Sequence, residues 1–199
     1  MTVAGLLLAA GAGRRMGTPK ALVVLDGEPL VVRALRALRD GGSSPRVVVV
    51  GAAADQVSAV VRAADPDAVV VRASAWERGM GESLRAGLGA LPDGVDAALV
   101  LLVDTPGIGA EALARVAAAA TPEGIVRGAY EGRPGHPVVF GRDHLAAVAA
   151  AAHDDVGARG YLAGRDDVAA VEVGDVATRD DVDTPADLAR LSPTRAQEG

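Results

Sequence analysis

Short apolar runs alternate with amphipathic segments along the first half of the chain, and this alternation restricts the fold more than any other feature. The strand-like runs and the helical segments between them cover, in turn, residues 3–9, 28–40, 46–50, 55–64, 68–72, 82–91 and 97–103. Pro29 near the start of the first helical segment and Gly41 after its end are typical helix boundary signals. Strands that alternate with helices form βαβ units. We therefore predict an α/β fold with a mostly parallel sheet and helices on both faces.

The second half of the chain follows a less regular order. The predicted elements are a helix at 110–119, a strand at 124–128, a glycine- and proline-rich loop at 130–137 that leads into the apolar residues 138–140, a helix at 143–152, a strand at 168–173 and a helix at 185–191. The sequence contains no internal repeat and no linker long enough to separate two independent domains. We predict one domain over residues 1–191 and a flexible tail at 192–199.

Composition excludes several classes of protein. The absence of cysteine excludes a disulfide framework, a thiolate zinc site and a cysteine nucleophile. The net charge is −6 with acidic and basic residues interleaved, so the sequence offers no basic stripe to nucleic acid. The first residues carry no charged segment ahead of an apolar stretch, and no apolar run is long enough to span a membrane. We expect a cytoplasmic monomer that binds neither nucleic acid nor membrane.

A glycine loop follows the first predicted strand, within the stretch LLLAAGAGRRMGTPKALVVL at residues 6–25. Its glycines allow successive backbone N–H groups to turn toward an anion. Arg15 offers a planar fork that suits phosphate oxygens. Lys20 is the only lysine of the chain, and its compact ammonium can sit against a single phosphoryl oxygen. These features predict a phosphate-binding loop.

Other interpretations of this loop are weaker but stay open. It lacks the Gly-Lys-Ser/Thr of a Walker A loop. Gly11-x-Gly13 begins like a dinucleotide-binding fingerprint, but Met16 stands where the third glycine belongs. Pro19 also interrupts the helix that would hold a pyrophosphate. A plain strand-to-helix turn is the remaining alternative.

Carboxylates follow two of the predicted strands. Asp104 comes after the most apolar run, and Asp181 and Asp183 lie in TRDDVDTPADL at 178–188. In open α/β sheets, ligands bind beyond the carboxyl ends of the strands, and carboxylates there are suited to a hard cation. Each aspartate has an alternative role as the cap of a turn or a helix.

The stretch LAAGAGRRMGTPKAL, residues 8–22, resembles the signature L-A-A-G-x-G-x-R-M-G-x-x-K of the MobA-like nucleotidyltransferases. The resemblance implies a Rossmann-like sheet of the nucleotide-diphospho-sugar transferase type. It implies that Arg15 and Lys20 are catalytic phosphate contacts, with Lys20 neutralising charge at the α-phosphate as pyrophosphate leaves. It also implies Mg²⁺ ligands and nucleotide contacts. These are Asp104, Asp183 and, as second choice within the last loop, Asp181 for the metal, and Leu8, Ala9, Ala10, Gly11 and Gly13 for the nucleotide.

Three later segments are similar to molybdenum cofactor cytidylyltransferases: ERGMGESLRAGL at 77–88, YEGRPGHPVVFGR at 130–142 and GARGYL at 157–162. By this resemblance, further nucleotide contacts are Gly79, Met80, Gly81 and Ser83, and acceptor contacts are Arg133, Gly135 and His136. We favour a substrate-contacting or loop-ordering role for His136 over a general base, because a phosphate nucleophile is already ionised at neutral pH. Thr105 departs from the pattern, since these enzymes more often have Gln or Met between the Asp and the Pro.

The resemblance implies a Mg²⁺-dependent transferase that uses CTP, acts on a molybdopterin-type acceptor and makes transient contact with a molybdoenzyme. The first alternatives are guanylyl transfer to the same cofactor and transfer to a sugar or polyol phosphate. Ala10 bears on the base, because guanylyltransferase relatives usually read L-A-G-G where this chain reads L-A-A-G. From other classes, we consider a non-catalytic nucleotide-binding chaperone of a molybdoenzyme and a dehydrogenase-like Rossmann protein.

Overall fold

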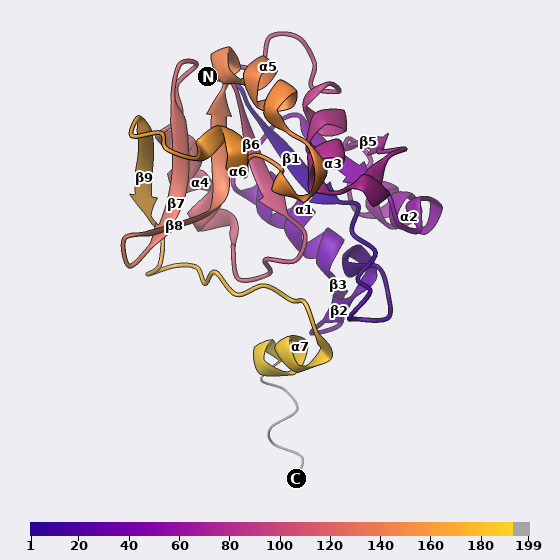
Figure 1. Cartoon of the computed structure of the whole chain (residues 1–199). Coiled ribbons are helices and arrows are strands. Elements are labelled where there is room, and N and C mark those ends of the chain that lie inside the picture. The colour runs from indigo at the N-terminus through magenta and orange to yellow at the C-terminus, as the bar shows by residue number, and fades with distance from the viewer. Residues whose placement is uncertain (193–199) are drawn as a thin grey trace.

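A seven-stranded sheet forms the centre of the molecule in the computed structural model, which describes residues 1–192 (Figure 1). The strand order is β5-β4-β1-β6-β8-β7-β9. β8 runs antiparallel to β6 and β7, and the other neighbours in the sheet are parallel. The strands are β1 (Val3–Ala9), β4 (Arg46–Val50), β5 (Val69–Arg72), β6 (Ala97–Leu102), β7 (Ile125–Tyr130), β8 (Arg133–Gly141) and β9 (Val168–Glu172). The predicted α/β class is confirmed.

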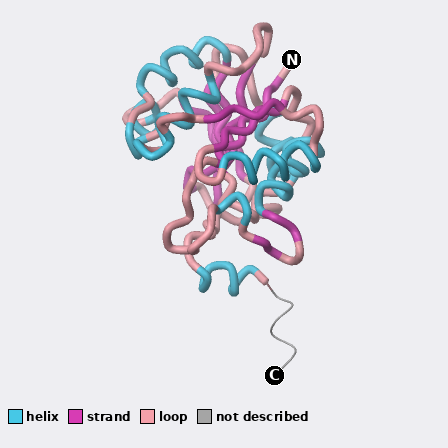
Figure 2. The backbone as a smooth tube through the Cα atoms, turned by 90° about the vertical axis from the view of Figure 1, so that its right-hand side faces the viewer, coloured by secondary structure: helices cyan, strands magenta, loops and turns pink. Residues whose placement is uncertain are grey.

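Helices cover both faces of this sheet, as the rotated view shows with the strands between two helical layers (Figure 2). One layer contains α1 (Leu30–Asp40), α2 (Ala54–Ala64) and α4 (Ala110–Ala118), and the other contains α3 (Met80–Leu88), α5 (Arg142–Ala151) and α6 (Arg159–Leu162). The last helix, α7 (Pro185–Leu191), lies beyond the carboxyl-end edge of the sheet (Figure 1). None of the helices within residues 1–192 is long and apolar enough to cross a membrane.

The two apolar layers follow from alternation along each buried strand. In β1, Leu7 belongs to the core under α1 and α4, whereas Leu6 and Leu8 belong to the core under α3 and α5. Side chains of consecutive strand residues point to opposite faces, so a strand covered on both faces is apolar throughout. Each fully buried leucine contributes about 1.5–3 kcal/mol through its removal from water. The aliphatic run of β1 is thereby fixed at the centre of the sheet.

The predicted loop at 130–137 is wrong, because most of it is strand. β7 extends to Tyr130 and β8 begins at Arg133. The connection is a two-residue turn in which Glu131 and Gly132 both have positive φ, 53° and 73°. Turns of this kind match the twist of paired strands, so the glycines and prolines here mark a tight hairpin.

Several short elements carry no periodicity and were not predicted. They are the hairpin strands β2 (Val24–Leu25) and β3 (Glu28–Pro29) and the 3₁₀ turns η1 (Lys20–Leu22), η2 (Trp76–Arg78) and η3 (Asp154–Val156). Because residues 28–29 pair with the preceding strand, the helix predicted from 28 begins at Leu30 instead. The predicted flexible tail at 192–199 lies, apart from its first residue, outside the described residues.

Candidate active site

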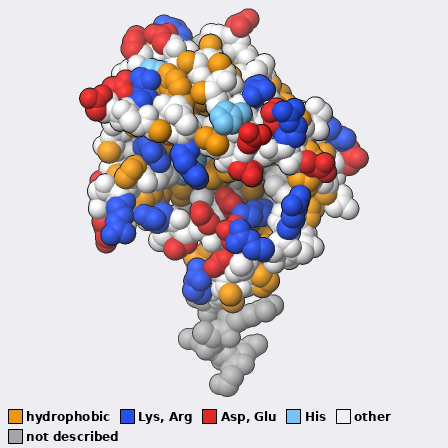
Figure 3. Space-filling view, viewed as in Figure 1, with side chains coloured by type: hydrophobic (Ala, Val, Ile, Leu, Met, Phe, Trp, Pro, Cys, Tyr) orange, Lys and Arg blue, Asp and Glu red, His pale blue; other side chains and the backbone are white. Residues whose placement is uncertain are grey.

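A cavity of about 430 Å³ opens beyond the carboxyl ends of β1 and β6. Figure 3 shows acidic and basic side chains gathered around a hollow on this face. The loop after β1, the residues after β6, the start of α3 and the loop before α7 all contribute. The lining residues are Leu8, Ala10–Arg15, Lys20, Trp76, Glu77, Gly79, Met80, Ser83, Leu102–Asp104, Asp155 and Asp183.

Gly13 shapes the loop after β1. Its φ is 59°, and a Cβ at this position would lie 1.9 Å from the carbonyl oxygen of Thr18. Only glycine therefore permits this close return of the chain. The carbonyl of Gly13 accepts a hydrogen bond from the N–H of Met16 at 2.8 Å, and the chain then reaches Lys20 at the first position of η1. The loop folds back on itself and presents Lys20 to the cavity.

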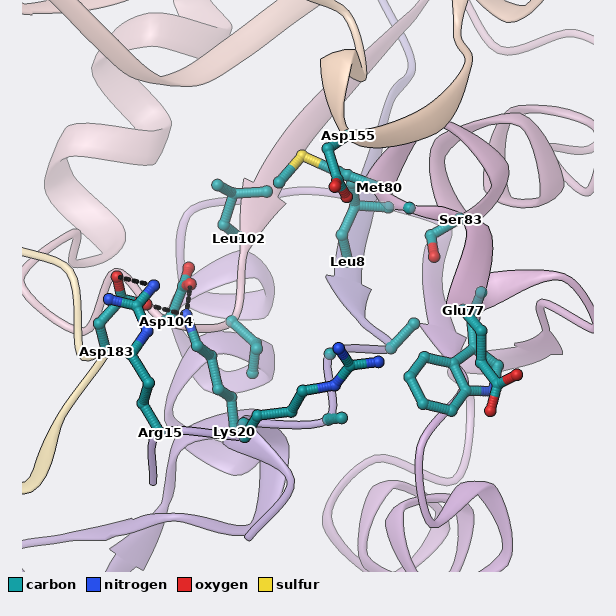
Figure 4. A pocket seen from close by; sticks show the side chains of 18 residues that line it. Leu8, Arg15, Lys20, Glu77, Met80, Ser83, Leu102, Asp104, Asp155 and Asp183 are labelled. Atoms are coloured by element: carbon teal, nitrogen blue, oxygen red, sulfur yellow. Dashed lines mark hydrogen bonds and ion pairs between the residues drawn. The ribbon is translucent and has the colours of Figure 1, made fainter. Parts of the chain in front are cut away.

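Lys20 joins the two carboxylates that the sequence assigns to a cation. Its Nζ donates a hydrogen bond to Oδ2 of Asp104 at 2.6 Å and another to Oδ1 of Asp183. Arg15 Nη2 lies 3.3 Å from the other oxygen of Asp183. Figure 4 shows Lys20 and Arg15 pointing toward this pair of carboxylates. The side chains of Lys20 and Asp104 are only 18% and 19% exposed, so these charges interact with little screening by solvent.

These contacts shift the pKa values in opposite directions. Burial alone lowers the pKa of Lys20, but Asp104 and Asp183 together outweigh it and raise that pKa above its ordinary value. The hydrogen bond from Lys20 lowers the pKa of Asp183, with a smaller contribution from Arg15. Desolvation, followed by repulsion from Asp104 and Asp183, raises the pKa of Asp181. Lys20 and Asp183 are thus held in their charged forms.

The residues after Asp183 explain why its carboxylate is not used as a helix cap and can face the cavity. Thr184 is the N-cap of α7 and forms a capping box with Asp187. Asp187 Oδ2 accepts hydrogen bonds from the N–H groups of Asp183 and Thr184, at 3.2 and 2.8 Å. The capping role that was an alternative for these aspartates therefore belongs to Asp187 and Thr184. Asp183 is left to face the cavity.

A model of the MobA-like NTP transferase domain matches residues 5–170, most of the chain. The chain belongs to the MobA-like NTP transferase family. The family predicted from the sequence is therefore confirmed. Its members are nucleotidyltransferases.

Relatives of this MobA-like chain carry more than one activity in their names. A nicotine blue oxidoreductase from Paenarthrobacter nicotinovorans is 37% identical over 198 residues, covering 95% of this chain and 96% of the relative. A molybdenum cofactor guanylyltransferase from Rhodobacter capsulatus is 34% identical over 150 residues, covering 74% of this chain and 67% of the relative.

Solved structures agree with the fold of this MobA-like protein. Rv0371c from Mycobacterium tuberculosis H37Rv superposes with a TM-score of 0.81 at 28% identity, covering 96% of this chain and 97% of that one. A complex of Rv0371c with manganese has a TM-score of 0.78 at 26% identity, covering 96% and 98% of the two chains.

Two carboxylates, rather than three, meet at the expected metal position in this MobA-like site. Asp104 and Asp183 converge on Lys20, but no group of three or more His, Cys, Asp or Glu side chains within residues 1–192 is arranged to hold a metal ion. Oxygen donors of this kind suit Mg²⁺, which is held by one or two carboxylates together with substrate phosphates. The residues present therefore fit a metal that arrives with a nucleotide.

Met80 and Ser83 form the other side of the cavity with Asp155, across from Lys20 (Figure 4). Ser83 is only 5% exposed. Asp155, in η3, and Glu77 also line the cavity, and neither was predicted as a site residue. No residue spacing pointed to Asp155, because its position depends on how η3 packs on α3.

Gly81 and Ala9 do not line the cavity, although both were expected to contact the nucleotide. A Cβ on Gly81 would lie 2.4 Å from the backbone nitrogen of His153, and one on Gly79 would lie 2.3 Å from the carbonyl carbon of Asp154. These two glycines allow η3 and the residue before it to pack closely on the start of α3. Gly79 also lines the cavity, whereas Gly81 is required by this internal packing.

The residues expected to bind the acceptor are not among the residues that line the cavity. Arg133 is exposed beside the turn of the β7–β8 hairpin. A Cβ on Gly135 would lie 2.9 Å from the ring of Tyr130, whose hydroxyl donates a 2.8 Å hydrogen bond to the carbonyl of His136. Burial lowers the pKa of His136, and the charge of nearby Arg127 lowers it further, against opposing effects of a Val100 backbone hydrogen bond and of Asp104. His136 is therefore neutral at pH 7.

Proposed function

We propose that this protein transfers a cytidylyl group from CTP to the phosphate of a molybdopterin-type cofactor, with Mg²⁺, and releases pyrophosphate. One observation carries the proposal: the sole lysine lies at the end of a glycine loop and touches two carboxylates from distant strand ends. Nucleotidyl transfer needs this combination, because a triphosphate, a divalent cation and a developing negative charge meet at one point. The molybdenum cofactor guanylyltransferase relative supports transfer to a molybdenum cofactor.

The chain's own residues act mainly by holding charges in place. Asp104 and Asp183 would hold Mg²⁺, which when bound supplies charge neutralisation on the triphosphate. Arg15, 71% exposed at its side chain, can turn from Asp183 to a phosphate oxygen. With Asp104 and Asp183 holding the metal, Lys20 would be free to contact the α-phosphate and would stabilise the charge that develops there. The acceptor phosphate needs no base, because it is ionised at neutral pH.

Residues on the side of the cavity where the nucleotide base would lie favour CTP. Ala10 lines the cavity where guanylyltransferase relatives usually carry glycine, and its methyl group reduces the room there. Ser83, which also lines the cavity, offers a hydroxyl to the base. A pyrimidine is the smaller base and fits this narrower space. GTP remains the first alternative, supported by the guanylyltransferase relative.

The proposal is tested by nucleotide binding and by product release. CTP with Mg²⁺ should raise the melting temperature more than GTP, ATP or UTP, because a ligand that binds the native state stabilises it by mass action. Pyrophosphate release should require CTP and the cofactor together.

Asp104→Asn and Asp183→Asn should lose most turnover, whereas Asp181→Asn should lose less, since Asp181 does not contact Lys20. A larger loss in Asp181→Asn than in Asp183→Asn would reverse that order.

The full-length similarity to nicotine blue oxidoreductase favours a second candidate, the reduction of a small organic substrate by a nicotinamide dinucleotide. The same cavity would then hold the dinucleotide pyrophosphate at the glycine loop. Titration with NADH and NADPH, followed by their fluorescence, separates the two functions. Saturable binding of a nicotinamide dinucleotide with no stabilisation by CTP and Mg²⁺ would replace the cytidylyltransferase proposal.

A further inference from the structure

Arg127 is a cation inside the sheet that has no partner of opposite charge among residues 1–192. It lies in β7, where it is half-buried between buried neighbours. β7 pairs with β8 on one side and β9 on the other, so the backbone of Arg127 is enclosed. No carboxylate in the described part of the chain forms an ion pair with it, and burial is the one cause that lowers the pKa of Arg127. The one hydrogen bond that its side chain forms in the described part of the chain is long, 3.5 Å from Nε to the carbonyl of Gly135.

Such an arrangement is costly unless an anion binds. A partly desolvated charge is stabilised by an opposite charge, and one carbonyl at the limit of hydrogen-bond distance leaves most of the five N–H donors to solvent or to a ligand. Arg46, 13% exposed, shows the usual pairing, since it binds Asp65 with two hydrogen bonds. Arg127 therefore differs from Arg46 in lacking its counter-ion.

The neighbouring histidine gives a second, independent sign of an unfilled site. Nδ1 of His136 is buried and has no hydrogen-bond partner within residues 1–192. Buried polar atoms are almost always paired, and exceptions point to a missing ligand. Tyr130 holds this segment in place through its hydroxyl, which stays protonated because burial raises the pKa of Tyr130 to about 12.

The sheet places Arg127 on the same face as the cavity. Ile125, two residues earlier on β7, belongs to the core under α3 and α5, so Arg127 leaves the sheet toward that layer. The register of β6 with β8 pairs Val100 with Val138, and its continuation sets His136 beside Leu102, which lines the cavity. Two strand spacings, about 10 Å, then separate β6 from β7. An arginine side chain covers much of that distance.

We infer that Arg127 binds the anionic phosphate group of the acceptor next to the nucleotide cavity, while Nδ1 of the neutral His136 accepts a hydrogen bond from a donor group of the same acceptor. This inference rests on the proposed function and assigns the acceptor side of the same site. The acceptor is then a phosphate monoester, held from the β7 side while Asp104 and Lys20 act from the β6 side. Arg133, which the sequence favoured for this role, is exposed at the hairpin turn and is the rival residue.

The test uses two probes on the full chain. The nucleotide site is first filled with α,β-methylene-CTP and Mg²⁺, and inorganic phosphate is then titrated by calorimetry. Arg127→Ala should weaken phosphate binding about ten- to a hundredfold while leaving the affinity for the CTP analogue unchanged. Arg127→Lys should retain part of the affinity. Arg142→Ala serves as the matched control, because Arg142 lies at the opposite end of β8 and pairs with Asp96.

The outcomes separate this inference from the proposed function. Equal phosphate affinity in the wild type and Arg127→Ala, or a loss confined to Arg133→Ala, overturns the Arg127 assignment. A loss of analogue affinity in Arg127→Ala also overturns it, since Arg127 would then serve the nucleotide. If the wild type binds no CTP analogue, the proposed function fails, and titrating phosphate into the free protein still decides whether Arg127 forms an anion site. Arg127→Gln replaces the alanine variant if that variant does not fold.

Discussion

At the scale of single residues, the identity of one side chain decides the chemistry of the cavity. Lys20 ends in a compact ammonium that contacts Asp104 and Asp183 at the same time. A guanidinium spreads its charge over a planar fork, so it cannot replace a point charge between two carboxylates or against one phosphoryl oxygen. In a chain with nineteen arginines and one lysine, this difference explains why lysine occupies this position.

We predict that Lys20→Arg folds normally but lowers kcat by about a hundredfold or more, comparable to the removal of one preorganised donor at a developing oxyanion. Steady-state turnover with CTP and cofactor measures the effect, and circular dichroism checks the fold. Arg62→Lys is the control, because Arg62 is exposed on α2 and does not line the cavity. Turnover of Lys20→Arg within threefold of the wild type would contradict a requirement for a point charge.

At the scale of elements, the alternation of strands and helices was predictable because periodicity reports burial directly. The β7–β8 hairpin was not, because its glycines and prolines are typical of loops and only the strand pairing shows that they lie in a sheet. The same limit applies to the site. Gly13 was identified from its loop, but the packing of Gly81 on His153 and the unpaired state of Arg127 depend on segments distant in the sequence.

One ion pair ties two elements together and makes stability depend on pH. Arg46 at the start of β4 donates to Asp65 just after α2, at 2.5 and 3.1 Å, and Asp65 is only 6% exposed. This hydrogen bond, against the opposing effect of burial, lowers the pKa of Asp65 below its ordinary value. The folded protein thus binds the Asp65 proton less readily than the unfolded chain does. The pair's contribution is complete above the unfolded pKa of about 3.9 and is lost as pH falls through the lower folded pKa.

We predict that Asp65→Asn lowers the free energy of unfolding at pH 7 by about 3–5 kcal/mol, because it leaves Arg46 partly buried without its partner. Urea denaturation at pH 7 and pH 3 measures this loss, and the difference between variant and wild type should shrink at the lower pH. Asp55→Asn is the control, since Asp55 pairs with Arg72 at 91% exposure and should change stability by less than about 1 kcal/mol. Equal losses in the two variants would mean that burial does not set the strength of the Arg46–Asp65 pair.

At the scale of the whole molecule, the cavity joins two halves of the chain through charges that compete for the same partners. The loop after β1 supplies the ammonium. The segment after β6 and the loop before α7 each supply one carboxylate. A divalent cation and Lys20 cannot both occupy the space between Asp104 and Asp183. The metal and the nucleotide should therefore bind cooperatively, because the triphosphate gives Lys20 another partner and adds oxygen ligands for the metal.

We predict that Mn²⁺ alone binds the wild-type protein weakly and that CTP strengthens its binding by at least about tenfold, a coupling of roughly 1.4 kcal/mol. Lys20→Met should bind Mn²⁺ without nucleotide more tightly than the wild type, because the carboxylates then face no ammonium, although the same change removes turnover. Electron paramagnetic resonance of free Mn²⁺ measures both affinities. The double variant Lys20→Met with Asp183→Asn should lose the gain, since one of the two carboxylates becomes a neutral amide. Weaker Mn²⁺ binding in Lys20→Met than in the wild type would show that Lys20 supports the metal site instead of competing with the metal for it.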